Sequence, residues 1–223
     1  EIRKIASMEM GIVPKELHDD GSVLQLQVGS STGMTPMIVK DNIEFIDEDT
    51  AERTGFPIET PFDKVGADIL LIHNAGEIMA WPENPGAFAI ILNAAGIKWT
   101  LASDEVGYDG VNYGLFYDDI QLARVGVKHA EAAKKLSVKK VVMGECGHAF
   151  RGAVYDGPKW MGWSKQPIPM THAVEYYYEL LKSGRIKIAN KIEEPVTIQD
   201  PCNIIRGRGL HEKLRYVVNE ICA

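Results

Sequence analysis

Cysteine is scarce in this chain, with three among 223 residues. An odd, small number does not provide the paired framework of a secreted disulfide protein, so we expect a reducing cytoplasm with thiols kept for chemistry or metal. Acidic residues outnumber basic ones, and the resulting net charge of −7 argues against nonspecific nucleic-acid binding, which needs a basic face. No apolar run approaches the roughly 20 residues that a membrane-spanning helix requires.

The sequence also lacks the motif of a nucleotide-binding loop. The glycine-rich segment 29–36 lacks the Gly-Lys-Ser/Thr ending of a phosphate loop, so it predicts an ordinary loop. At 45% hydrophobic residues, the composition is that of a globular protein with enough apolar mass for a core. Both ends of the sequence fall within predicted helices, so we expect a piece of a longer polypeptide whose ligand set is incomplete.

Strands and helices alternate from residue 67 onward, which predicts an α/β fold with a mainly parallel sheet. Asn84 and Pro85 predict an N-cap and first helical residue, and Asp118 or Asp119 is expected to cap a long helix. Strands are predicted at 67–73, at 99–102, around 141 and at 196–199, and helices at 41–54, 84–95, 118–135, 172–182 and 210–222.

Two strand-turn-cysteine units suggest an internal duplication into two similar Rossmann-like βα repeats. Under this interpretation, residues 61–150 form the first repeat and residues 151–223 begin the second. Residues 1–60 have no place in either repeat, so they are expected to form a helical segment that wraps the core or links it to something upstream.

Cys202 is the main candidate for a functional thiol. The β-branched segment 196–199 predicts a strand, Pro201 ends it, and a helix is expected from residue 210. The carboxyl end of a strand is where α/β sheets bind ligands, and backbone amides at a following helix start would stabilise a thiolate. A buried structural cysteine is the alternative, but the polar turn around Cys202 favours function.

Cys146 and His148 form a second candidate pair in Gly-Glu-Cys-Gly-His. This pair predicts either a nucleophile with its base or one corner of a metal site, and an incidental thiol in a polar turn remains equally compatible. Because Met143 stands where a Cys-x-x-Cys pair would need its first thiol, a two-cysteine metal clip is excluded here. Cys222, on the final predicted helix, is interpreted as structural.

Several remaining polar and aromatic residues have less specific interpretations. His73 is better explained as a satisfied histidine near the core than as a ligand. Basic residues around the Cys202 turn are expected either to lower the thiol pKa or to form a solvated helix face. They are Arg206, Arg208, Lys213 and Arg215, and the polar loop after the strand at 99–102 contains Asp104, Glu105, Tyr108 and Asn112.

Several motifs resemble the D subunit of heterodisulfide reductase and its relatives. Asp200-Pro201-Cys202-Asn203, with Arg206, resembles the second cysteine-rich (CCG) repeat of that family. More narrowly, four segments resemble the K subunit of the membrane-associated Dsr electron-transfer complex of dissimilatory sulfate reducers. These segments are 73–77, 81–85, 107–114 and 144–149, so the resemblance covers nearly the whole chain.

The resemblance implies an iron–sulfur oxidoreductase, cytoplasmic and attached to the membrane through partner subunits. It implies a 4Fe-4S or non-cubane cluster with Cys202 as its first ligand, lined by Asp200 and Arg206 and faced by Cys146. The remaining cysteines of that motif would lie beyond Ala223. The first repeat is expected to hold no cluster of its own, because 106–108 and 143–146 depart from the family's cysteine pattern.

The implied reaction passes electrons from a quinol-linked membrane complex to a heterodisulfide or trisulfide of a small sulfur-carrier protein, with Cys202, Cys146 and His148 as candidate catalytic residues. Two alternatives stay open. One is a related electron-transfer subunit of a complex that oxidises glycolate or lactate. The other is a cluster-free scaffold that docks partner proteins.

Overall fold

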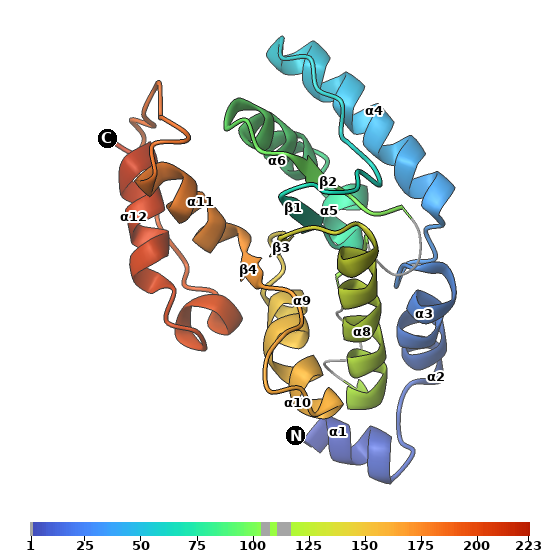
Figure 1. The fold of residues 1–223 in the computed structure, drawn as a ribbon. Coiled ribbons are helices and arrows are strands. Elements are labelled where there is room, and N and C mark those ends of the chain that lie inside the picture. Colours follow the sequence, from blue (N-terminus) through green and yellow to red (C-terminus); the bar gives the residue numbers. More distant parts are fainter. Residues whose placement is uncertain (1, 104–107, 111–116) are drawn as a thin grey trace.

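A four-stranded parallel sheet organises the chain in a computed structural model, which describes residues 2–103, 108–110 and 117–223 (Figure 1). The strands lie in the order β2-β1-β3-β4, and each neighbouring pair is parallel. The predicted α/β class with a parallel sheet is therefore confirmed. The strands are β1 (Ile69–Ile72), β2 (Trp99–Thr100), β3 (Lys140–Met143) and β4 (Met170–His172).

Helices cover both faces of this sheet and also form the N-terminal segment, as predicted (Figure 1). The α-helices are α1 (Ile2–Lys4), α2 (Lys15–Leu17), α3 (Leu24–Val28), α4 (Pro36–Thr54), α5 (Ala75–Ala80), α6 (Glu83–Ala94), α8 (Asp119–Lys135), α9 (Gly147–Arg151), α10 (Gly157–Met161), α11 (Ala173–Lys182) and α12 (His211–Ile221). Short π-helical segments are η1 (Ile5–Glu9), η2 (His18–Val23), η3 (Gly152–Asp156) and η4 (Cys202–Arg206).

Strand β1 lies at the centre of the core and is apolar on both faces. Ile69 and Leu71 pack into one apolar cluster with side chains of α4, α6 and α11, whereas Leu70 and Ile72 pack into a second with side chains of α8, α9 and η4. Because helices bury both faces, the strand is a continuous apolar run rather than an alternating one.

The ends of several helices agree with the local sequence signals. The Asp118 side chain caps α8 by accepting hydrogen bonds from two backbone N–H groups, and α4 ends at Gly55 in the left-handed conformation. Helix α6 differs, because it begins at Glu83 and places Asn84 inside the helix instead of at its N-cap. Pro85 is still tolerated there, since the first-turn N–H groups have no intrahelical acceptor.

One strand prediction was wrong, and one strand was missed. Residues 196–199 are not a strand, because the segment is largely exposed and pairs with no other strand among the described residues. Sequence reasoning also missed β4, a three-residue strand that pairs with β3. One sheet is present in the part of the chain that is described, and the internal duplication stays a prediction.

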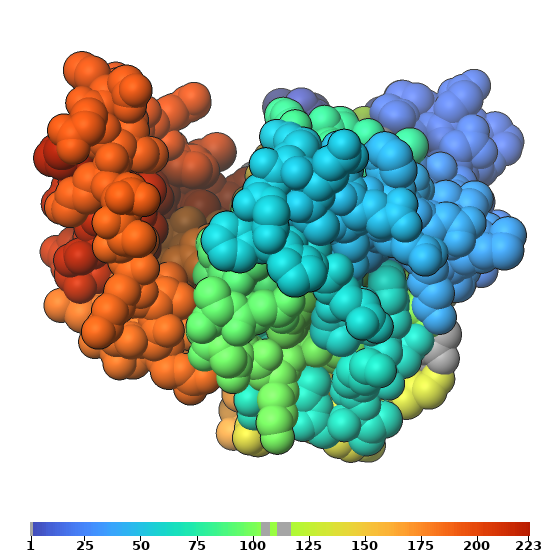
Figure 2. Space-filling model, turned by 90° about the horizontal axis from the view of Figure 1, so that it is seen from above, coloured from blue at the N-terminus to red at the C-terminus, as the bar shows by residue number. Residues whose placement is uncertain are grey.

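The C-terminal segment from α11 onward extends to one side of the sheet (Figure 1). In the space-filling view, a hollow separates this orange and red segment from the cyan and green part of the surface (Figure 2). Helices α11 and α12 pack through an edge-on contact between Tyr178 and Tyr216, whose ring centroids are 5.2 Å apart. Across the described residues, no helix combines the length and apolarity that crossing a membrane requires.

Close packing of α4 on α6 depends on Gly86. A Cβ atom at this position would lie 2.2 Å from Thr50 Oγ1. We expect Gly86→Ala to lower the free energy of unfolding by about 1–3 kcal/mol, because the two helices must move apart. Urea denaturation measures the change in the free energy of unfolding, with Gly126→Ala as the control. Gly126 is a helical glycine with open space around its Cβ position, so alanine there should stabilise by about 0.5–1 kcal/mol. Equal effects of the two substitutions would contradict the packing argument.

Candidate functional site

The carboxyl ends of β1 and β3 form the candidate site. These strands are neighbours, but the chain leaves β1 for α5 and α6 and leaves β3 for α9, which pack with opposite apolar clusters. At such a point the two connections diverge and open a crevice, which is where open α/β sheets bind ligands.

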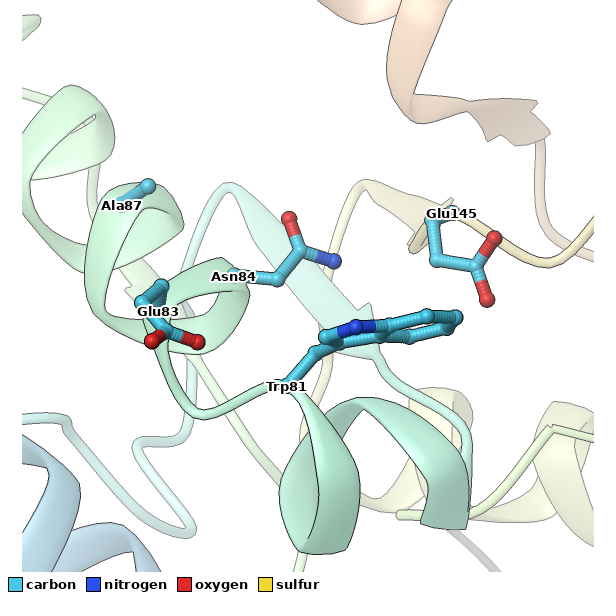
Figure 3. A pocket seen from close by; sticks show the side chains of 5 residues that line it. All are labelled: Trp81, Glu83, Asn84, Ala87 and Glu145. Atoms are coloured by element: carbon cyan, nitrogen blue, oxygen red, sulfur yellow. The ribbon is translucent and has the colours of Figure 1, made fainter.

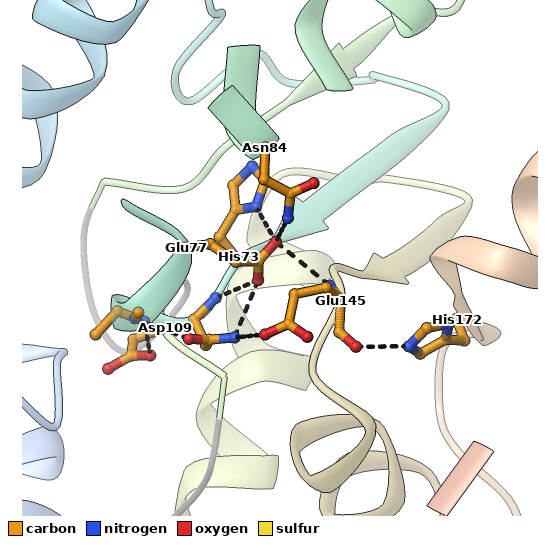
Figure 4. A network of polar contacts seen from close by, with 9 residues as sticks. His73, Glu77, Asn84, Asp109, Glu145 and His172 are labelled. Atoms are coloured by element: carbon orange, nitrogen blue, oxygen red, sulfur yellow. Dashed lines mark hydrogen bonds and ion pairs between the residues drawn. The ribbon is translucent and has the colours of Figure 1, made fainter. Parts of the chain in front are cut away.

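A buried carboxylate, Glu77, joins the two loops at this edge (Figure 4). Its oxygens accept hydrogen bonds from His73 Nδ1 at 3.0 Å, from Asn84 Nδ2 at 2.8 Å, and from the backbone and side-chain N–H groups of Asn74 at 2.9 and 3.1 Å. The backbone N–H of Glu145, in the loop after β3, also donates at 3.3 Å. Glu77 thus holds β1, α6 and the β3 loop in one arrangement.

The surroundings of Glu77 keep it ionised. Burial alone would raise its pKa, but the charge and hydrogen bond of His73, together with the N–H groups of Asn74 and Glu145, bring the pKa below its ordinary value. The backbone after β3 also passes close to this carboxylate, since a Cβ atom at Gly144 would lie 2.6 Å from a Glu77 carboxylate oxygen. A glycine at position 144 therefore allows the β3 loop to pass over the carboxylate.

His172 fixes the other side of the same loop. Its Nε2 lies 3.1 Å from the backbone oxygen of Glu145, and its Nδ1 accepts from the backbone N–H of Val174 at 3.2 Å (Figure 4). This pattern assigns a neutral ring with the proton on Nε2, and burial lowers the pKa of His172 accordingly. Glu145, the residue that precedes Cys146, is thus held at its backbone N–H by Glu77 and at its carbonyl by His172.

Asp109 is a second buried carboxylate at this edge. It accepts from the backbone N–H of Ala75 at 2.8 Å and from the N–H of Ser31 at 2.8 Å, and also from the hydroxyls of Ser30 and Ser31. Burial raises the pKa of Asp109 despite these donors. The glycine-rich loop that lacked phosphate-binding features therefore has a structural role, because it surrounds an internal carboxylate.

Cys146 lies at the N-terminus of α9, where its Sγ accepts from the backbone N–H of Ala149 at 3.5 Å. Burial raises the pKa of the Cys146 thiol to about 11, and burial also lowers the pKa of His148. A raised thiol pKa does not favour an activated nucleophile with His148 as its base.

Cys202 is exposed and begins η4, so it follows an extended coil rather than the predicted strand. Its segment nevertheless packs against the start of α9. A Cβ atom at Gly147 would lie 3.3 Å from Asn203 Cβ and 3.9 Å from the backbone nitrogen of Ile204. Tertiary packing thus brings together the two segments that carry Cys146 and Cys202.

The other predicted site residues divide between this region and its periphery. Asp200 forms a two-point ion pair with Arg215, in which Nη2 and Oδ2 are 3.1 Å apart, and this pair lowers the pKa of Asp200. Arg206 is exposed at the end of η4. Cys222 directly follows α12 and forms a parallel β-bridge with Ile192. Asp104, Glu105 and Asn112 lie outside the described residues.

These residues fit an iron–sulfur cluster only as part of a ligand set. Cys146 has a backbone N–H donor to its sulfur, a feature of cluster ligands, and Cys202 is accessible. A cubane cluster needs four thiolates, however, and the two segments contribute two. Within the described ranges, no group of three or more His, Cys, Asp or Glu side chains is placed to hold a metal ion.

The polar network was largely missed by sequence reasoning, which interpreted His73 as a satisfied core residue and assigned no site role to Glu77. One local signal for it exists. Asn74 and Glu77 form a capping box at the start of α5, and this asparagine-x-x-glutamate spacing directly follows a buried strand. The partners from α6 and the β3 loop have no comparable signal, because they are distant in sequence.

Curated proteins are similar to this chain. The D subunit of the dihydromethanophenazine:CoB–CoM heterodisulfide reductase of Methanosarcina mazei is 33% identical over 141 residues, which cover 60% of this chain and 33% of that protein. An Hdr-like menaquinol oxidoreductase iron–sulfur subunit of Archaeoglobus profundus is 26% identical over 204 residues, covering 75% of the chain and 37% of that protein. The chain resembles heterodisulfide-reductase-like subunits.

A further relative extends the match along the chain. Hdr-like menaquinol oxidoreductase iron–sulfur subunit 2 of Archaeoglobus fulgidus is 23% identical over 231 residues, covering 87% of this chain and 42% of that protein. The chain therefore spans 33% to 42% of the length of these three relatives. No family model and no solved structure matches it. The resemblance to the heterodisulfide reductase D subunit is confirmed, whereas the Dsr and CCG particulars stay predictions.

Proposed function

We propose that this chain is part of an iron–sulfur electron-transfer subunit of the heterodisulfide-reductase type. The names of its relatives support an iron–sulfur cofactor and a place among several subunits. The structural observation that carries the proposal is the packing of Gly147 against Asn203 and Ile204. This contact gathers the Cys146 and Cys202 segments at the carboxyl-end edge of the sheet, where α/β proteins bind ligands.

In this proposal Cys146 and Cys202 each supply a thiolate to a cluster whose remaining ligands come from elsewhere in the protein. The Glu77 and His172 hydrogen bonds to the peptide of Glu145 position Cys146, and the Asp200–Arg215 pair orders the approach to Cys202. When bound, the cluster supplies one-electron redox chemistry.

We further propose that the substrate is a disulfide or trisulfide of a small sulfur-carrier protein. The electrons that reduce it would come from membrane subunits that oxidise quinol. Reduction of a disulfide consumes two electrons and two protons, breaks one S–S bond and releases two thiols. The printed names of the relatives, which include a heterodisulfide reductase and menaquinol oxidoreductases, support this class of reaction.

Substitution of the cysteines tests the cluster. We expect Cys202→Ser and Cys146→Ser each to lower the bound iron and alter the EPR spectrum of the full-length protein purified anaerobically, because serine replaces a thiolate ligand. Cys222→Ser is the matched control and should leave both unchanged. Unaltered iron content and spectrum in both test variants would refute the ligand assignment, and an intact protein without iron would favour a docking scaffold. Turnover with hydroxy acids instead of disulfides would indicate the other enzyme class.

A further inference from the structure

An open cavity of about 390 Å³ lies beside the Glu77 network, between the end of α5, the start of α6 and the loop after β3. Figure 3 shows the indole ring of Trp81 extending from the end of α5 toward Glu145, with the Asn84 amide on the same side. Trp81 is 62% exposed, although tryptophan is usually well buried. The lining residues are Trp81, Glu83, Asn84, Ala87 and Glu145.

The polar lining of this cavity consists mainly of hydrogen-bond acceptors, two of its residues being glutamates. Asn84 Nδ2 donates one of its two N–H groups to Glu77, and its Oδ1 remains to accept from a ligand. Glu145 uses Oε1 to accept from Asn74 Nδ2 at 3.0 Å, which leaves Oε2. Among the five described lining residues there is no lysine, arginine or histidine, and the side-chain donors left for a ligand are the indole N–H and the second N–H of Asn84 Nδ2.

Glu83 adds a second carboxylate at the rim. Its Oε1 is 3.6 Å from Arg53 Nη1, a loose pair between two exposed side chains that leaves the carboxylate accessible. The walls are rigid on the inner side, because Glu77 hydrogen-bonds both Asn84 and the peptide of Glu145. A prearranged set of acceptors next to an exposed aromatic face is complementary to a flat cation that carries donors alone.

We propose that this cavity binds the guanidinium group of an arginine side chain presented by another protein. The guanidinium plane stacks on Trp81, while its N–H groups donate to Glu145 and Asn84. Arginine fits better than lysine because its five donors lie in one plane that matches both the indole face and a carboxylate. The surface position of Trp81 suits a side chain that enters from a docked partner.

The test follows the indole N–H resonance of Trp81, assigned by its loss in Trp81→Phe, in NMR spectra of the full-length protein. N-acetyl-arginine methylamide should shift this resonance with saturation at millimolar concentration. N-acetyl-citrulline methylamide, which has the same shape without the charge, should bind at least tenfold more weakly, because charge-assisted hydrogen bonds are lost. Equal affinity for the two compounds, or no shift with either, would overturn the proposal.

Two further comparisons decide the ligand and its source. Glu145→Gln should weaken arginine binding about tenfold, whereas Glu52→Gln, an exposed glutamate on α4, should leave it unchanged. Equal binding by the Glu145 variant and the wild type would contradict the assigned contact. Butylguanidine, a small guanidine with a single positive charge and no peptide backbone, separates the sources. Binding at least tenfold tighter than that of the capped arginine would assign the cavity to a small molecule and overturn the docking of a partner.

Discussion

Replacement of Glu77 by alanine should lower the free energy of unfolding by about 3–5 kcal/mol, among the largest effects of any single substitution in this chain. The reason is the number of buried donors that would lose their acceptor. The carboxylate accepts hydrogen bonds from His73, Asn74, Asn84 and the backbone N–H of Glu145. Because the Glu77 side chain is 0% exposed, water does not reach these donors to take the place of the lost acceptor. Chemical denaturation at neutral pH measures the loss.

Glu77→Gln tests the charge separately from the shape. The pKa of Glu77 in the folded protein lies below its ordinary value of 4.5, so its charge stabilises the fold fully above about pH 4.5. That contribution disappears as the pH falls through the folded-state pKa. The stability difference between wild type and Glu77→Gln should therefore be largest at neutral pH and shrink below pH 4.5. Glu52→Ala, at an exposed site, should have little effect at any pH, and a similar loss there would contradict the network argument.

Acid should destabilise the protein through His129, which is fully buried on α8. Burial lowers its pKa to about 4, while its ordinary value is 6.5. Between these values the unfolded chain binds a proton at this residue and the folded protein does not. Stability therefore falls as the pH drops from 6.5 to about 4, and the loss from this residue alone is about 3 kcal/mol.

His129→Gln removes this titration. In the wild type, His129 Nε2 lies 2.9 Å from the backbone oxygen of Asp109, and glutamine keeps an N–H donor for that acceptor. Stability measured across pH 4 to 6.5 should be flatter in the variant by about 3 kcal/mol, whatever its stability at pH 7. His211→Gln, at an exposed position of α12, should retain the wild-type slope. An unchanged slope in His129→Gln would show that this histidine is not protonated on unfolding.

The predicted strand at 196–199 and the missed strand β4 show where the local sequence pattern does not predict strand formation. Three successive β-branched residues favour extended backbone, but a strand also needs a partner, and this segment has none among the described residues. Residues 170–172 have a weaker local pattern, yet they pair with β3 at the edge of the sheet. Strand formation at these positions depends on the presence of a neighbouring strand to pair with and not on the β-propensity of the residues.

Local sequence patterns correctly predicted the parallel α/β class, the buried strand β1, and the helix boundaries at Asp118 and Gly55, because each depends on residues a few positions apart. Folding created the contacts that join Glu77 to α6 and the β3 loop, that bring Gly147 to Asn203, and that gather acceptors around Trp81. These contacts link segments well separated along the chain. Packing and hydrogen bonding between distant segments depend on the whole fold, and no local pattern encodes them.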